Sequence, residues 1–258
     1  MANASGMPSW IDLATTDLDA ARDFYSKLFG WTAQVTPEPQ ARGYTLFLKD
    51  GKQVAGVGPL MMPEQPPSWT MYVATDDAEA VAARVEGANG KVLVAPMDVF
   101  DFGRMAVFMD TAGAVFSAWQ AGTHPGGEVF DEPGTYTWSE LITRDPGGGK
   151  EFYRHVFGWT GSDRPGGPVP YTAFKLNGVP AAGLMPMVEG MFPPDRPDHW
   201  LNYVAVADTD ATAEKAKQLG GSLSVEPRDI APGRFAIIND PQGAFLAVIT
   251  MNPDFRPE

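Results

Sequence analysis

The sequence predicts an α+β fold made of four βαβββ modules, arranged as two tandem halves. One observation behind this prediction is an internal duplication, in which residues 10–32 match residues 138–160 at a constant offset. The other is a pattern of strand, aspartate and amphipathic helix that occurs twice in each half. Because duplicated segments with one pattern form equivalent structural units, we expect the same topology in every module.

The duplication is carried by aromatic, aspartate, threonine and glycine positions. Ten of the 23 aligned positions are identical, whereas average residue usage predicts roughly one or two. The identical pairs are Trp10/Trp138, Leu13/Leu141, Thr15/Thr143, Asp17/Asp145, Phe24/Phe152, Tyr25/Tyr153, Phe29/Phe157, Gly30/Gly158, Trp31/Trp159 and Thr32/Thr160. A Gly- and Pro-containing stretch without apolar periodicity separates the copies. We therefore predict a first domain at residues 8–121, a linker at 122–135 and a second domain at 136–251.

The first module begins with an alternating strand at Trp10–Thr15. Asp17 follows, and its carboxylate can cap a helix by accepting backbone N–H groups. Gly30 ends that helix, as glycine does at the position after a helix. The apolar residues between them share one helical face; they are Ala21, Phe24, Tyr25, Leu28 and Phe29. Short β-like runs at residues 44–48 and 54–57 complete the module.

The second module repeats this order from Trp69, with Asp77 ahead of a helix that contains Val81 and Val85. It closes with strands near residues 105–109 and 114–119. The second half of the chain follows the same order, which gives four modules in all.

The bulk composition excludes several classes of partner. A net charge of -13 and a pI near 4.6 argue against nucleic acid and against an anionic membrane surface. No apolar run approaches the roughly 20 residues that span a bilayer, and Met1–Ser9 does not resemble a signal peptide. The chain contains no cysteine, so thiolate chemistry is excluded. We expect a cytoplasmic protein, a monomer or homodimer, with a small molecule as its partner.

Three segments carry a resemblance to a known family: TTDLDAARDFYSKLFGW, TRDPGGGKEFYRHVFGW and NDPQGAFLAV. They resemble the vicinal oxygen chelate superfamily, which contains glyoxalase I, bleomycin-resistance proteins and extradiol dioxygenases. The resemblance covers nearly the whole chain apart from the linker and the tail after Met251. It implies that each half curls into an incomplete β-barrel-like sheet around a pocket, with the helices outside.

The resemblance also implies where a divalent metal would be bound. In the family, ligands lie seven residues before the first helix-capping aspartate, near the start of the fifth strand, and four residues after the closing glycine. The corresponding positions here are Trp10 and Trp138, Trp69 or Thr70 and Trp200 or Leu201, and Ser117 and Ala247. Indole and apolar side chains offer no lone pair to such a cation. We therefore predict no metal and no other cofactor.

Strand alternation predicts which side chains share the pocket face. It pairs Trp10 with Asp12 and Trp138 with Glu140. It also pairs Trp200 with Asn202, and Trp69 with Met71. We expect ligand contacts from Trp10, Trp69, Trp138, Trp200, Asn202 and Arg234, with Asp12 and Glu140 as candidate catalytic carboxylates. Two alternatives stay open: the indoles can be core residues, and the carboxylates can be structural partners of Arg104 or Arg234.

Two functional hypotheses follow. The first is a metal-free protein of the bleomycin-resistance type that binds an aromatic or amine-bearing molecule in a Trp-lined pocket. The alternative is a lyase, isomerase or dioxygenase with a relocated site, built from Glu140 with Asp12 or His199. Because Glu140 and Asn202 replace Asp12 and Met71, we expect the second half to bind a ligand better.

Overall fold

Each quarter of the chain forms one βαβββ module in the computed structural model, which describes residues 3–62, 64–164 and 169–255. Module 1 contains β1 (Pro8–Thr15), α1 (Leu18–Phe29), β2 (Thr32–Val35), a 3-10 turn (Pro39–Ala41), β3 (Thr45–Lys49) and β4 (Lys52–Pro59). Module 2 contains β5 (Ser68–Ala74), α2 (Ala78–Gly87), β6 (Lys91–Val99), β7 (Gly103–Met109) and β8 (Val115–Ala121). Module 3 contains β9 (Thr135–Thr143), α3 (Pro146–Phe157), β10 (Thr160–Arg164), β11 (Tyr171–Leu176) and β12 (Val179–Pro186). Module 4 contains β13 (His199–Ala205), α4 (Thr209–Gln218), β14 (Ser222–Ile230), β15 (Gly233–Asn239) and β16 (Phe245–Met251).

The strands form two eight-stranded mixed sheets, one from each half of the chain. The first has the order β2-β3-β4-β1-β5-β8-β7-β6, and the second has the equivalent order β10-β11-β12-β9-β13-β16-β15-β14. This equivalence confirms the predicted α+β fold of four modules in two tandem halves. The sheets are open at both edges, in agreement with an incomplete barrel.

The helix boundaries follow from the residues named in the sequence. The Asp17 carboxylate accepts a hydrogen bond from the Ala20 N–H at 3.0 Å, which begins α1. Gly30 ends the helix with φ 75°, a left-handed conformation that glycine adopts without a steric cost. Asp77 and Asp208 cap α2 and α4 in the same way. The predicted helix boundaries are therefore confirmed in residue detail.

The chain divides into two compact units that do not coincide with its halves. The inner-module unit consists of Met1–Ser9, Met71–Gly126 and Trp138–Leu201, and so holds most of modules 2 and 3. The outer-module unit consists of Trp10–Thr70, Gly127–Thr137 and Asn202–Glu258, and so holds most of modules 1 and 4. The predicted domains at 8–121 and 136–251 thus describe the two sheets, while each compact unit combines modules from both halves.

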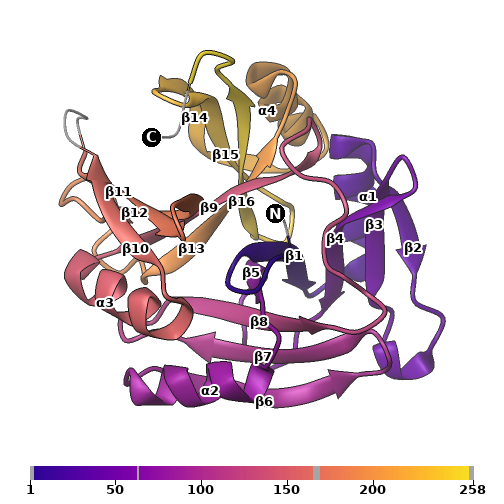
Figure 1. Cartoon of the computed structure of the whole chain (residues 1–258). Helices are drawn as coiled ribbons and strands as arrows, with labels where there is room; N and C mark the ends of the chain where they lie inside the picture. The colour runs from indigo at the N-terminus through magenta and orange to yellow at the C-terminus, as the bar shows by residue number, and fades with distance from the viewer. Residues whose placement is uncertain (1–2, 63, 165–168, 256–258) are drawn as a thin grey trace. The chain divides into compact units, whose positions relative to one another are not determined.

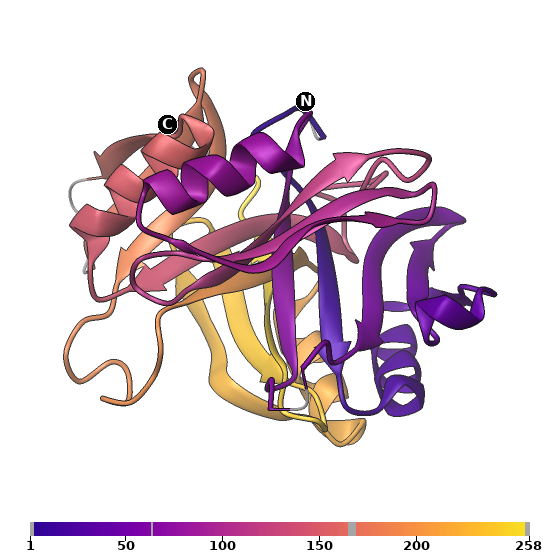
Figure 2. The same ribbon diagram turned by 90° about the horizontal axis from the view of Figure 1, so that it is seen from below.

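Each unit has its own apolar core between helices and strands. In the inner-module unit α2 packs on β6 and β7, and α2 and α3 lie side by side (Figures 1 and 2). In the outer-module unit α1 packs on β4, and α4 packs on β14 and β15. The helices therefore cover one face of the strands in each unit. No helix in the described part of the chain is long and apolar enough to cross a membrane.

A buried chain of hydrogen bonds joins three modules within the inner-module unit. The Trp200 Nε1–H donates to the Tyr153 hydroxyl at 2.8 Å, and that hydroxyl donates to Asp110 Oδ2 at 3.1 Å. The other oxygen of Asp110 accepts three backbone N–H groups at 2.9 Å each, from residues 112–114. Burial raises the pKa of the Tyr153 hydroxyl well above its ordinary value, so the phenol stays neutral.

The outer-module unit contains the equivalent chain. The Trp69 Nε1–H donates to the Tyr25 hydroxyl at 2.9 Å, which donates to Asp240 Oδ2 at 3.0 Å. All three residues match their counterparts in the duplicated sequence. We call these two networks the Trp–Tyr–Asp chains.

Removing the central hydroxyl tests their contribution to stability. Tyr153→Phe leaves the buried Trp200 N–H and Asp110 carboxylate each without one hydrogen bond. We expect the free energy of unfolding to fall by about 1–3 kcal/mol. Tyr25→Phe should lose a similar amount in the other unit. The control Thr160→Val removes an exposed hydroxyl and should change stability by less than about 0.5 kcal/mol. Urea unfolding measures all three, and a Tyr153→Phe variant as stable as the control would contradict the role of the chain.

Candidate functional site

In each half, the first strand carries a tryptophan and a carboxylate on the face opposite the helices. In β1, Ile11 and Leu13 lie in the core, so Trp10 and Asp12 point to the opposite face. In β9, Leu141 lies in the core. The alternation of the strand then places Trp138 and Glu140 together on the opposite face.

Tyr44 bridges the tryptophan and the carboxylate in the first copy. Its hydroxyl accepts from Trp10 Nε1–H at 3.3 Å and donates to Asp12 Oδ2 at 3.4 Å. Gly56 of β4 lies beneath the phenol, where any β-carbon would overlap with the Tyr44 hydroxyl. We call Trp10, Asp12 and Tyr44 the first site; it lies in the outer-module unit.

The second copy has the same arrangement, with a longer carboxylate and a more accessible tryptophan. The Trp138 Nε1–H donates to the Tyr171 hydroxyl at 3.0 Å, and Tyr171 is hydrogen-bonded to Glu140. Gly183 of β12 lies beneath Tyr171. We call Trp138, Glu140 and Tyr171 the second site; it lies in the inner-module unit. Trp138 is half-buried, whereas Trp10 is only 4% exposed, so the second site is the more open to a ligand.

Burial raises the pKa of both site tyrosines well above the ordinary value, and the adjacent carboxylate raises it further. Each phenol is therefore a neutral hydrogen-bond donor at physiological pH. The arrangement offers an indole, a phenol and a carboxylate on one face, which suits binding of a flat ring with a polar substituent.

The prediction that Trp69 and Trp200 face the pocket was wrong. Both indoles point to the helix side, where each donates to the tyrosine of a Trp–Tyr–Asp chain. The core interpretation is therefore the correct one for these two residues. Asn202 is also buried on that side, and its Nδ2 donates to the Trp69 carbonyl oxygen at 3.2 Å. Asn202 thus supports β5 in the outer-module unit, whereas Glu140 belongs to the inner-module unit.

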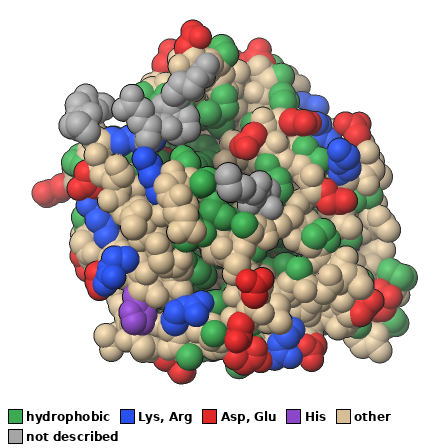
Figure 3. Space-filling model, viewed as in Figure 1, with side chains coloured by type: hydrophobic (Ala, Val, Ile, Leu, Met, Phe, Trp, Pro, Cys, Tyr) green, Lys and Arg blue, Asp and Glu red, His purple; other side chains and the backbone are tan. Residues whose placement is uncertain are grey.

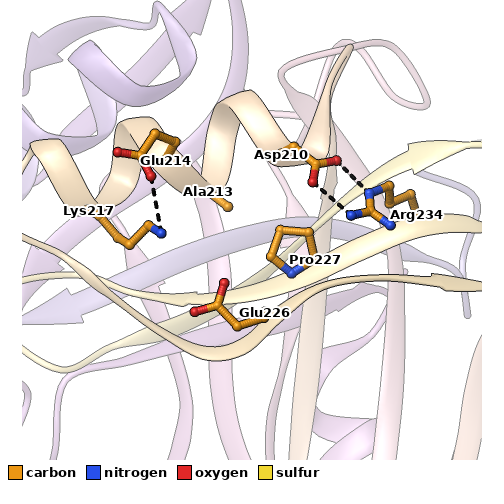
Figure 4. Close-up of a pocket in the computed structure, with 7 residues that line it drawn as sticks. All are labelled: Asp210, Ala213, Glu214, Lys217, Glu226, Pro227 and Arg234. Atoms are coloured by element: carbon orange, nitrogen blue, oxygen red, sulfur yellow. Dashed lines mark hydrogen bonds and ion pairs between the residues drawn. The ribbon is translucent and has the colours of Figure 1, made fainter.

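Arg234 is held by carboxylates that the sequence did not indicate. Its Nη2 donates to Asp210 Oδ1 at 2.7 Å (Figure 4). Its Nη1 donates to Asp229 Oδ1 at 3.1 Å. These bonds raise the pKa of the guanidinium, which stays charged. Arg104 makes the equivalent pairs with Asp98 and Glu79. The predicted alternative partners, Asp12 and Glu140, are therefore not the carboxylates that pair with these arginines.

Arg234 also borders an open depression of about 440 Å³ between α4 and the β14–β15 hairpin. Its lining side chains largely pair with one another: Arg234 with Asp210, and Lys217 with Glu214 at 3.1 Å. Arg234–Asp210 joins the hairpin to α4, whereas Lys217–Glu214 lies within α4. Mutually neutralised exposed groups of this kind leave little charge for a ligand.

His199 lies on the face opposite the helices, because its neighbour Trp200 points to the helix side. Its Nδ1 lies 2.8 Å from the Pro197 carbonyl oxygen, which can only accept, so Nδ1 carries the proton. Burial lowers the pKa of the imidazole, which favours the neutral form.

The residues at the expected metal positions do not fit a metal. Trp10 and Trp138 use their only polar group, an N–H donor, on a tyrosine. The fifth-strand positions on the same face are Thr70 and Leu201, since their neighbours Trp69 and Trp200 point to the helices. Within residues 3–62, 64–164 and 169–255, no three His, Asp or Glu side chains gather closely enough to hold a metal ion.

Comparison with known proteins decides the family. The glyoxalase/bleomycin resistance protein/dioxygenase superfamily matches residues 8–149 and 135–248. The chain belongs to this superfamily. It is 41% identical over 98% of its length to "Anthracycline biosynthesis protein DnrV" of Streptomyces peucetius, covering 96% of that protein. It is 42% identical over 96% of its length to "Anthracycline biosynthesis protein DauV" of Streptomyces sp. (strain C5), covering 94% of that protein.

Solved structures of superfamily members share the fold. The Mn(II)-bound glyoxalase from Novosphingobium aromaticivorans has a TM-score of 0.66 at 16% identity, over 95% of this chain and 82% of that chain. The 2,3-dioxygenase LapB from Pseudomonas sp. KL28 has a TM-score of 0.65 at 11% identity, over 98% and 97%. At such identities the likeness concerns the fold alone.

Sequence reasoning missed Tyr44 and Tyr171, which connect the polar groups of the two sites. A signal was present, because both tyrosines are matched positions of the duplication. Their roles depend on β3 and β11 lying beside the glycine-containing strands β4 and β12. Alternation within one strand does not reveal that neighbourhood.

The raised pKa of Tyr171 leads to a prediction at alkaline pH. A pKa that is higher in the folded state than in the unfolded state stabilises the folded protein. This contribution is fully present below pH 10.0, the ordinary pKa of tyrosine, and is lost as the pH rises through the pKa of Tyr171 in the folded state. Glu140→Gln removes one cause, so the pKa of Tyr171 should fall while burial keeps it above the ordinary value. Absorbance titration of phenolate measures it, with Tyr171→Phe to assign the signal. An unchanged titration curve in Glu140→Gln would contradict the Tyr171–Glu140 contact.

Proposed function

We propose that the protein binds a small planar aromatic molecule at the second site, without a metal. The observation that carries this proposal is the Trp138–Tyr171–Glu140 arrangement on the face opposite the helices, with Gly183 beneath the phenol. An indole beside ordered polar groups binds a flat ring through its face and orients the substituents of that ring.

The names of the relatives support the same class of ligand. Two proteins that share about two fifths of their residues with this chain are named for anthracycline biosynthesis, and anthracyclines are polycyclic aromatic compounds. The first site repeats the arrangement with a shorter carboxylate and a tryptophan that is 4% exposed. We therefore assign the main binding role to the second site, on the difference between Glu140 and Asp12 and on the accessibility of Trp138; Asn202, which the prediction included, lies outside this site. Catalytic roles for Glu140 and Asp12 stay predictions.

Binding can be tested with 2-(hydroxymethyl)anthraquinone, a neutral planar probe, followed by quenching of tryptophan fluorescence. Trp138→Leu should weaken binding roughly tenfold, because it removes the aromatic contact while retaining apolar bulk. The matched control is Trp69→Phe, which changes an indole on the helix face and should leave the affinity within twofold. Weakening by Trp69→Phe and none by Trp138→Leu would place the ligand elsewhere.

Metal content provides an independent test. Because the indole N–H groups of Trp10 and Trp138 donate to tyrosines and cannot ligate, we expect no stoichiometric zinc, iron, nickel or manganese in purified protein. Elemental analysis by mass spectrometry measures this content. About one tightly bound metal per chain, whose removal abolishes an activity, would contradict the proposal and favour a superfamily lyase, isomerase or dioxygenase.

A further inference from the structure

Arg164 distinguishes the second site from the first. It is the last residue of β10 and lies directly across from Tyr171 in the antiparallel pair β10–β11. Residues opposite each other in such a pair project to the same face. The guanidinium carbon lies 5.9 Å from the centre of the Tyr171 ring, within the range of a cation–π contact. Arg164 therefore belongs to the same surface as Tyr171, Trp138 and Glu140.

The first copy has no cation at the equivalent position. Thr36 stands 128 residues before Arg164, the offset that relates residues 10–32 to residues 138–160. Its backbone N–H donates to the Tyr44 carbonyl oxygen at 2.8 Å. Thr36 is thus the counterpart of Arg164 opposite the site tyrosine. Beside the tyrosine, the first site presents the carboxylate of Asp12, whereas the second presents the carboxylate of Glu140 and the guanidinium of Arg164.

This difference changes the charge that each site can accept. The whole chain carries -13, and Figure 3 shows acidic side chains over much of the visible face, with Lys and Arg among them. An anionic ligand is repelled at long range by such a chain and needs a local cation. A cation–π contact leaves the positive charge of the guanidinium in place, so Arg164 can lie near Tyr171 and still attract the carboxylate group of a ligand.

We propose that Arg164 makes the second site selective for planar aromatic molecules that carry an acidic group, such as a ring carboxylate. This inference rests on the proposed function, since it specifies the ligand class of the same site. The ring lies against Trp138, and the acidic group meets Arg164 rather than Glu140, because a carboxylate repels another carboxylate. The first site, with Asp12 and Thr36, offers an acidic group no such partner.

The test uses two probes that differ in one substituent: anthraquinone-2-carboxylate and the neutral 2-(hydroxymethyl)anthraquinone. Arg164→Thr reproduces the residue of the first copy. It should weaken the carboxylate probe by about tenfold to a hundredfold, the range for loss of one charge-assisted interaction, and leave the neutral probe within twofold. Arg154→Thr is the matched control, since it removes the same charge from an exposed arginine of the same unit; it should leave both affinities within twofold.

The outcomes separate this inference from the proposed function. Equal binding of the carboxylate probe by wild type and Arg164→Thr overturns the role of Arg164, while binding of the neutral probe still supports the aromatic site. If Arg154→Thr and Arg164→Thr weaken binding of the carboxylate probe equally, the role of Arg164 is also overturned, because the loss would then come from the changed net charge of the protein. Failure of both probes to bind the wild type overturns the proposed function together with this inference.

Discussion

A tyrosine hydroxyl buried between a tryptophan N–H and an aspartate carboxylate is the interaction on which each compact unit depends. Tyr153 accepts one hydrogen bond and donates another, so both capacities of the phenol are used in an apolar surrounding. Its partners, Trp200 and Asp110, come from modules 4 and 2, while Tyr153 comes from module 3. Because unpaired buried groups are costly, the three modules are held in one register.

The same constraint determines which side chains remain for function. Because Trp69 and Trp200 lie on the helix face, their neighbours in β5 and β13 point to the opposite face. The opposite face of β1 and β9 then carries the remaining tryptophan–carboxylate pairs, each bridged by a tyrosine above a glycine. The core chains are alike in both copies, whereas these sites differ in carboxylate length and in Arg164 against Thr36. These differences between the copies thus lie on the face opposite the helices, outside the Trp–Tyr–Asp chains.

The helices and the module order were predictable because their signals are local: Asp17 caps the first turn of α1, and Gly30 ends its last turn. The face of β5 on which Trp69 lies was not predictable, because its hydrogen-bond partner Tyr25 lies 44 residues earlier in the chain. The edge strands β2 and β6 were also missed; β2 is short, and the register of β6 against β7 shifts twice. Which modules share a core depends on packing between both halves, so the domains at 8–121 and 136–251 describe sheets rather than cores.

We expect Trp138, on the face opposite the helices, to contact the ligand, whereas Trp69 and Trp200 on the helix face support the fold. Titration of ¹⁵N-labelled protein with 2-(hydroxymethyl)anthraquinone, followed through the indole N–H resonances of its seven tryptophans, tests it most directly. The Trp138 resonance should move with ligand, and the Trp69 and Trp200 resonances should stay in place. Movement of Trp69 and Trp200 with a stationary Trp138 would contradict it.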